Sequence, residues 1–219
     1  LPRLVRQEWK LFWLCMLLFW GPFFALMFSA EHDILWVQSV LGPQQMAQLE
    51  HSWAEGRDVS EIRDNFGSNF EMFSFYIWNN VGIDLRCFAG GILYGLGTIF
   101  FMVYNGVMMG AVSGYVGQAA DPWNFLRWVS GHAVPELLGM ILSGMAGLKI
   151  GFALIHSGRK TKKQALIDNG RIAIRLLVGA IVLTSFAAVI EGFWSPVPFP
   201  PFLKSVSYTH LRAHETSAY

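Results

Sequence analysis

Long stretches without a charged residue constrain this chain more than any other feature. Leu11 to Ala30 has 20 such residues, and Cys87 to Ala120 has 34. At about 1.5 Å per residue, a helix of about 20 residues crosses the roughly 30 Å hydrocarbon core of a bilayer. Further apolar runs cover 128–148 and 176–190. We therefore expect an all-α, polytopic transmembrane helical bundle.

The composition excludes the main alternatives. Charged residues make up 14% of the 219 residues, against roughly 25% in an average globular domain. Eighteen Phe and nine Trp are too much apolar surface for a soluble core of this size. The same balance excludes disordered, collagenous and disulfide-rich chains. Cys15 and Cys87 both fall in apolar runs, so we expect buried thiols rather than a disulfide or a metal pair.

The distribution of charge predicts an orientation. Basic residues gather before the first run and between the last two; they are Arg3, Arg6, Lys10, Arg159, Lys160, Lys162, Lys163 and Arg171. The positive-inside rule places both stretches in the cytosol. The segment 31–84 instead carries nine acids and two bases, which fits the extracytoplasmic side.

Keeping both basic stretches in the cytosol requires an even number of crossings between them. Asn105-Gly106 is a turn signal in the middle of the long second run. We therefore expect separate segments at 87–104 and 107–120, the latter short or re-entrant. With the apolar runs before and after them, these give about five spans, a cytosolic N-terminus and an extracytoplasmic C-terminus.

The chain divides into three parts. Residues 1–10 form a basic cytosolic N-terminus, and because the chain starts at Leu1 we expect a fragment that lacks a preceding segment. Residues 11–195 form the helical membrane domain, with 31–84 as its extracytoplasmic segment. Aromatic residues from Phe66 to Trp78 predict a helix on the membrane surface. Residues 196–219 form a Pro-rich tail with an end that we expect to be non-native.

Small residues recur at spacings of four on three of the predicted helices. They are Gly91, Gly95, Gly106, Gly110, Gly114, Ser143, Gly147 and Gly151. Small residues on one helical face allow two helix backbones to approach closely in lipid. The spacing fits packing within the chain, and it also fits a face for a partner's membrane helix.

His132 and Glu136 are four residues apart and therefore share one helical face. A charge at mid-membrane costs at least about 2.5–3.5 kcal/mol, so such residues usually have a role. The pair has three interpretations: a structural lock between helices, a functional polar site such as a proton relay, and a metal site. A metal site needs three or four ligands and no HExxH motif exists, so we expect no metal.

Two other polar residues complete the predicted polar cluster. Glu191 ends the last span, and in a five-span arrangement it lies near the same outer face as His132, so we expect a contact between them. Asn105 either caps a helix or bonds across spans.

Catalytic patterns are weak. Ser113 lies in a Gly-Ala-Val-Ser-Gly sequence that does not match an intramembrane serine protease element, and no Gly-rich phosphate loop with a Lys is present. We expect no enzymatic activity, no catalytic residues and no cofactor. The basic loop lacks interleaved aromatics, so we expect it to meet anionic lipid headgroups and not nucleic acid.

The order of motifs resembles the stage II sporulation protein M family of bacterial integral membrane proteins. The blocks that carry the resemblance are 79–83, 88–98, 104–111, 131–137, 143–148 and 190–195, within about Pro2 to Pro196. Two departures stand out. Gly131 precedes the histidine where many members have proline, as in a subgroup from non-sporulating bacteria. The upstream cytosolic helical segment of many members is not present in this chain.

The resemblance implies a multi-pass protein of the cytoplasmic (inner) membrane without known enzymatic activity. The family's namesake anchors two partners that degrade peptidoglycan during engulfment. Our first hypothesis is therefore a scaffold in the lipid bilayer that organises membrane or envelope proteins, with peptidoglycan hydrolases as one class of partner and homo-oligomerisation left open. The alternative is a small-solute or proton pathway that uses the His132–Glu136 pair.

Overall fold

The computed structural model describes residues 1–30, 32, 34–54 and 67–195. These residues form helices and no strand, which confirms the all-α prediction. The elements are α1 (Pro2–Gln7), α2 (Trp9–Ser29), α3 (Ile34–Ser52), α4 (Asn69–Tyr76), η2 (Ile77–Val81), α5 (Gly82–Ala89), η3 (Gly90–Ile92), α6 (Leu96–Ala119), α7 (Pro122–Val129), α8 (Ala133–Ile155), α9 (Lys162–Val189) and η4 (Ile190–Trp194).

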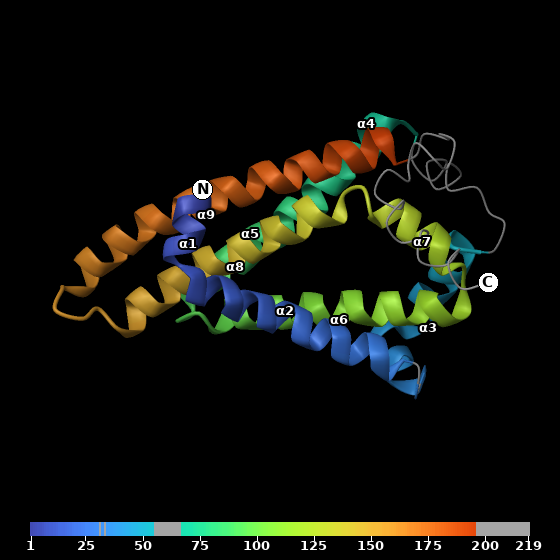
Figure 1. Ribbon diagram of the computed structural model, residues 1–219, viewed down its shortest axis with the longest axis horizontal. Coiled ribbons are helices and arrows are strands. Elements are labelled where there is room, and N and C mark those ends of the chain that lie inside the picture. The colour runs from blue at the N-terminus through green and yellow to red at the C-terminus, as the bar shows by residue number, and fades with distance from the viewer. Residues whose placement is uncertain (31, 33, 55–66, 196–219) are drawn as a thin grey trace, which may run out of the picture.

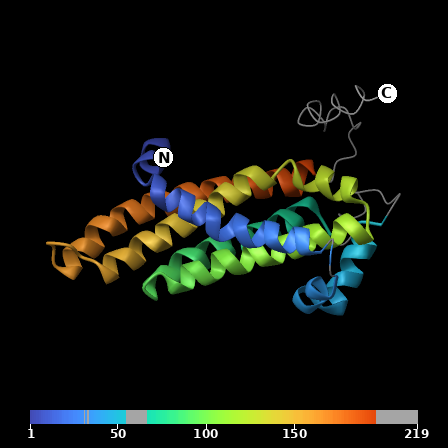
Figure 2. The same ribbon diagram turned by 60° about the horizontal axis from the view of Figure 1, so that its bottom comes forward.

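Within the described residues, four helices are long and apolar enough to cross a membrane: α2, α6, α8, and α9 extended by η4. The protein is therefore a multi-pass membrane protein. A fifth element, formed by α4, η2 and α5 in succession, runs lengthwise among them (Figures 1 and 2). It packs against α6, α8 and α9, so it belongs to the bundle.

The turn expected at Asn105-Gly106 was predicted wrongly. Both residues lie inside α6, which is one continuous helix of 24 residues. The chain turns earlier, where Tyr94 and Gly95 have φ values of 54° and 84°. A glycine tolerates this left-handed conformation without steric cost. Residues 107–120 are therefore the second half of α6 and its end, and neither a separate span nor a re-entrant segment.

The segment between residues 31 and 84 also differs from the prediction. From Asn69 onward it joins the bundle, and the backbone of Phe73 lies directly against Gly192 of η4. We had placed this stretch outside and on the membrane surface; Phe66 lies outside the described residues, as do residues 55–66 and 196–219 as a whole. The helix expected on the membrane surface instead packs against the bundle, which the charges of Glu71, Asp84 and Arg86 had concealed, and the extracytoplasmic position of 31–84 stays a prediction.

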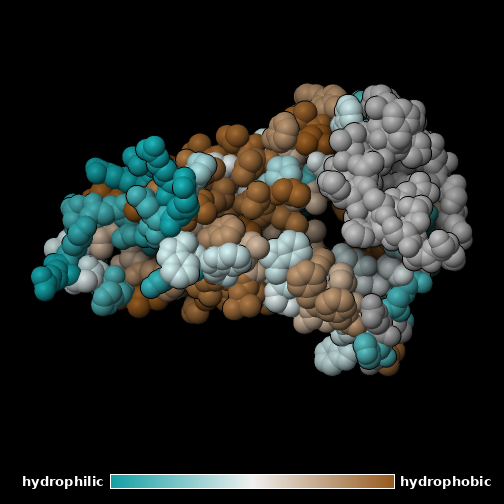
Figure 3. Space-filling model, in the orientation of Figure 1, coloured by the Kyte–Doolittle hydropathy of each residue, from teal (hydrophilic) through white to brown (hydrophobic). Residues whose placement is uncertain are grey.

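The two basic stretches lie towards the same end of the bundle (Figure 1). Four elements run lengthwise between them: α2, the α4–α5 element, α6 and α8. Of these four, α2, α6 and α8 are long and apolar enough to cross a membrane, and the even number of crossings stays a prediction. Figure 3 shows hydrophilic residues gathered at this end and a hydrophobic band beside them.

Glycines bring α6 against α2. A Cβ atom at Gly106 would overlap the carbonyl oxygen of Phe19, and one at Gly110 would overlap that of Phe23. At Gly114 a Cβ atom would lie 2.7 Å from the Cβ atom of Ala30. Only hydrogen fits between these backbones, so this face of α6 is occupied by the chain's own helix.

A second set of glycines joins α8 to the turn before α6. A Cβ atom at Gly91 would overlap the carbonyl oxygen of Gly147, and one at Gly151 would overlap the backbone of Gly95. Gly147 also lies against Thr98, whose hydroxyl donates a 2.7 Å hydrogen bond to the carbonyl oxygen of Cys87. Cys87 and Cys15 are buried free thiols, as predicted.

Opposite the basic end, α3 and α7 form a cap on the bundle (Figure 1). The Asp121 amide donates a 2.8 Å hydrogen bond to the carbonyl oxygen of Trp53, and the Trp53 ring meets those of Phe125 and Trp128 edge to face. The Tyr115 hydroxyl of α6 also bonds to Glu50 of α3. These contacts hold the cap, which we define as α3 and α7, on the end of α6.

The glycine contacts give a first prediction. Gly110→Ala should lower the free energy of unfolding in mild detergent by about 1–3 kcal/mol, because the added methyl group forces α2 and α6 apart. Thermal unfolding of the purified protein measures this. Gly117→Ala is the matched control, since no atom lies within 4 Å of its Cβ position. Equal stability of the two variants would contradict the contact.

Candidate functional site

Three polar side chains from two helices converge near the cap. His132 is the N-cap residue of α8, and Glu136 lies in the first turn of that helix. Pro135 fits between them because the amides of the first turn need no partner within the helix. Glu191 comes from η4, a π-helical turn that ends α9. Such turns are rare and are frequent at functional sites.

The three side chains are close and largely shielded from solvent. Nε2 of His132 lies 3.5 Å from Oε1 of Glu191, and these side chains are only 5% and 7% exposed. One nitrogen or oxygen atom from each of His132, Glu136 and Glu191 lies within 4.8 Å of the others. Tyr76 and Trp128 also face the Glu191 carboxylate. We call His132, Glu136 and Glu191 the three-residue cluster.

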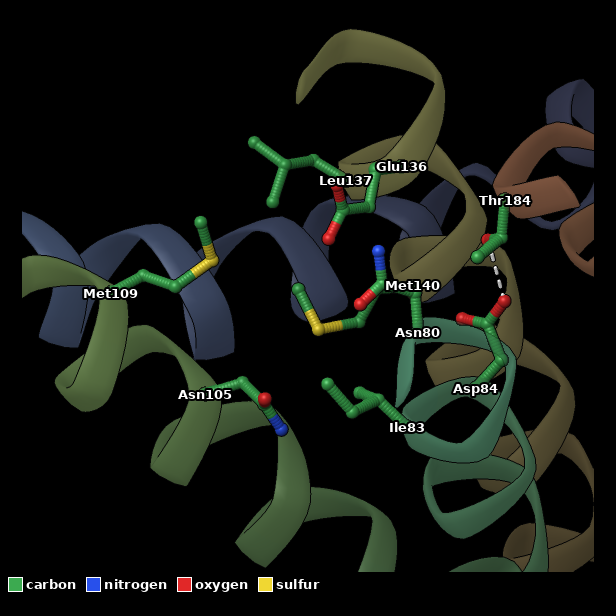
Figure 4. Close-up of a pocket in the computed structure, with 9 residues that line it drawn as sticks. All are labelled: Asn80, Ile83, Asp84, Asn105, Met109, Glu136, Leu137, Met140 and Thr184. Atoms are coloured by element: carbon green, nitrogen blue, oxygen red, sulfur yellow. Dashed lines mark hydrogen bonds between the residues drawn. The ribbon is translucent and has the colours of Figure 1, made fainter. Parts of the chain in front are cut away.

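A small cavity lies beside the three-residue cluster. Its volume is about 30 Å³, and it is lined by Asn80, Ile83, Asp84, Asn105, Met109, Glu136, Leu137, Met140 and Thr184. A polar site of about 10–15 Å³ already holds one water molecule, so this cavity has room for one or two. Figure 4 shows Glu136 and Asn80 pointing into it from α8 and η2. Glu136 therefore belongs to both the cluster and the cavity wall.

A buried carboxyl group lies on the other side of this cavity. Asp84 is only 1% exposed, and the Thr184 hydroxyl of α9 donates a 2.6 Å hydrogen bond to it (Figure 4). The side chain of Ser143, on α8, faces the same carboxyl group. In a bundle without bulk water, such hydrogen bonds fix the relative rotation of the helices.

Comparison with known proteins decides the family. The profile of the family described as Stage II sporulation protein M matches residues 11–196. This chain belongs to the stage II sporulation protein M family. It is also similar to the uncharacterized protein MJ0793 of Methanocaldococcus jannaschii, with 25% identity over 142 residues, covering 64% of this chain and 78% of that protein. No solved structure matches the chain.

In this member of the stage II sporulation protein M family, the predicted polar residues separate into two places. His132, Glu136 and Glu191 come together, and the expected contact between His132 and Glu191 is present. Asn105 lies across the cavity from Glu136 (Figure 4). Its amide nitrogen donates a 2.7 Å hydrogen bond to the carbonyl oxygen of Phe101, within its own helix.

Sequence reasoning missed Asp84, Asn80 and Thr184. We counted Asp84 among the external acids because it precedes the uncharged run. A signal existed: Asn80, Asp84 and Cys87 follow at intervals of four and three, the pattern of one helical face. All three are buried on the face of the α4–α5 element that meets the bundle.

The arrangement supports three kinds of chemistry. It can lock α8 to the end of α9 through the His132–Glu191 contact. It can pass or store a proton between the carboxyl groups that flank the cavity. It can also offer imidazole nitrogen and carboxylate oxygen atoms to a cation.

Proposed function

We propose that this protein is a scaffold in the bacterial cytoplasmic membrane that holds envelope proteins at its extracytoplasmic cap. It has no catalytic activity of its own in this proposal. Membership of the family supports a membrane protein of this type. Because the family's namesake anchors proteins that degrade peptidoglycan, we include proteins that remodel peptidoglycan among the proposed partners. The observation that carries the proposal is a firmly attached cap with exposed aromatic side chains.

The distribution of charge supports the orientation. The N-terminal bases and the basic loop between α8 and α9 lie towards the end opposite the cap (Figures 1 and 3). Lys and Arg are enriched in the cytosolic loops of membrane proteins. We therefore assign the basic end to the cytosol and the cap to the outside.

Cysteine labelling tests this orientation. Cys15 and Cys87 are buried, so they give little background. In intact cells, an impermeant maleimide should label Gln48→Cys on α3 and should not label Lys163→Cys until the membrane is opened. Both native side chains are exposed, which makes the two sites comparable. Labelling of Lys163→Cys alone in sealed cells would invert the proposed topology.

The cap is the better candidate for a partner surface because the small-residue faces are already used within the chain. Gly106, Gly110 and Gly114 contact α2, and Gly147 contacts Gly91. On the cap, Trp36 and Trp123 are 63% and 53% exposed. Exposed tryptophan residues on a fixed platform are typical of protein interfaces. Interfacial lipid is the competing occupant, and crosslinking separates the two.

Photocrosslinking in living cells tests the scaffold function. Benzoylphenylalanine in place of Trp36 or Trp123 should give a discrete protein adduct, because a partner covers the cap. The adduct, identified by mass spectrometry, should contain a protein with an extracytoplasmic envelope domain. The control is benzoylphenylalanine in place of Val182, which is 63% exposed on a membrane-spanning part of α9. Adducts with lipid only, or the same adducts at Val182, would contradict the proposal.

The cavity favours a second candidate function, a proton or small-solute pathway. Its wall brings Asp84, Glu136, Asn80 and Asn105 together within the bundle. Ionisable residues inside a membrane bundle often line transport pathways. This function needs a hydrated route from the cavity to both sides, and the cavity itself has room for only one or two waters.

A flux assay tests this second function. If it is correct, proteoliposomes with the native protein dissipate a pH gradient, and Glu136→Gln abolishes the flux while thermal unfolding stays within a few degrees of the native value. Asn105→Ala, which changes the opposite wall of the cavity, should alter the rate. A native protein that carries no flux above empty liposomes would remove the candidate.

A further inference from the structure

The three-residue cluster has the composition of a metal site. We propose that His132, Glu136 and Glu191 bind one divalent transition-metal cation of the zinc type. From the sequence we expected Glu191 to lie beside His132, but we expected no metal. The fold brings η4 beside the first turn of α8, so that one ligand atom from each of the three residues lies close to the other two.

The distances favour a shared ion over a direct hydrogen bond. Nε2 of His132 and Oε1 of Glu191 are 3.5 Å apart. A charge-assisted hydrogen bond between such groups is shorter, about 2.7–2.9 Å. Two ligands that are each about 2.0–2.1 Å from a tetrahedral zinc ion lie about 3.4 Å apart. All three ligand atoms lie within 4.8 Å of one another, so a tetrahedral site requires only a small inward movement of the side chains.

Unsatisfied buried atoms point to a missing partner. Nδ1 of His132 and Oε2 of Glu191 are buried and have no hydrogen-bond partner among the described residues. Both side chains are more than nine-tenths buried. A buried polar atom without a partner costs about 1–3 kcal/mol. A cation between the side chains would give the unpaired Oε2 of Glu191 a partner, while Nδ1 of His132 would remain the nitrogen that does not bind the ion.

Charge balance also favours a divalent ion. Two carboxylates near each other in a poorly solvated site repel, and a cation between them removes this repulsion. A divalent cation with two carboxylates and a neutral imidazole has no net charge. A neutral site is what burial near a membrane requires, since an uncompensated buried charge costs several kcal/mol.

The donor set selects among divalent cations. Imidazole nitrogen suits zinc, iron, copper and nickel, whereas calcium takes six to eight oxygen ligands. The soft ligands that favour copper(I) are not in the cluster, because Cys15 and Cys87 belong to the core where α2, α5, α6 and α8 meet. Tyr76 and Trp128 face Glu191 and would hold its carboxylate in place. We therefore take zinc as the ion to test.

Direct metal analysis tests the site. The full chain, purified in mild detergent with a tag that contains no histidine, is stripped with a chelator, incubated with Zn²⁺ and desalted. Mass spectrometry of the metal should find about one zinc per chain. Co²⁺ in place of zinc should give the visible absorption of a low-coordinate site. A stripped, folded protein that retains no zinc above a blank would overturn the proposal.

Isosteric variants separate this site from other zinc-binding groups. Glu136→Gln and Glu191→Gln should each weaken zinc binding at least tenfold, because each removes a charged ligand. Glu71→Gln, at an exposed carboxylate on α4, is the matched control and should bind like the native protein. Zinc should also raise the melting temperature of the native protein and not of the Gln variants. Zinc binding that is unchanged in both Gln variants would place the metal elsewhere and refute the site.

Discussion

Close contact between helix backbones is the constraint on which the bundle depends. In lipid there is no hydrophobic force between helices, so packing and interhelical hydrogen bonds must hold them. Gly106 and Gly110 allow α2 and α6 to touch through their backbones, and Gly91 and Gly147 do the same for the turn and α8. This contact leaves no room for a Cβ atom. The cavity lies among the helices that these contacts hold together, since residues of α6 and α8 line it.

The buried polar pairs determine how the packed helices are rotated relative to one another. Asp84 with Thr184, and His132 with Glu191, connect different helices at defined heights. Each pair is costly to break, because the remaining partner would be buried without compensation. Glycine contacts thus set how near the helices lie, and the polar pairs set how they are rotated. The cavity forms where Asn80, Asn105 and Glu136 are left between these contacts.

The sequence predicted the class of fold well because uncharged length is a direct consequence of the bilayer. It failed at the 34-residue run, because Asn105-Gly106 is a turn signal in water but a packing position in a membrane helix. It also failed at the α4–α5 element, where Asp84 made a bundle helix resemble an external segment. In both places contacts between distant residues decided the outcome, such as Thr184 with Asp84. All three residues of the cluster were named from the sequence, Glu191 through its expected contact with His132, while the cavity that separates Asn105 from them required the fold.

The length of α9 has a consequence for the cytosolic side of the proposed topology. Together with η4 it covers 33 residues, about 50 Å of helix, whereas the hydrocarbon layer needs about 30 Å. Since Glu191 is held near the cap, the surplus must emerge at the other end. Its first turns, which carry Lys162 and Lys163, then form a stalk that lifts the α8–α9 hairpin clear of the lipid headgroups. A soluble factor or a protease could reach that hairpin without touching the membrane.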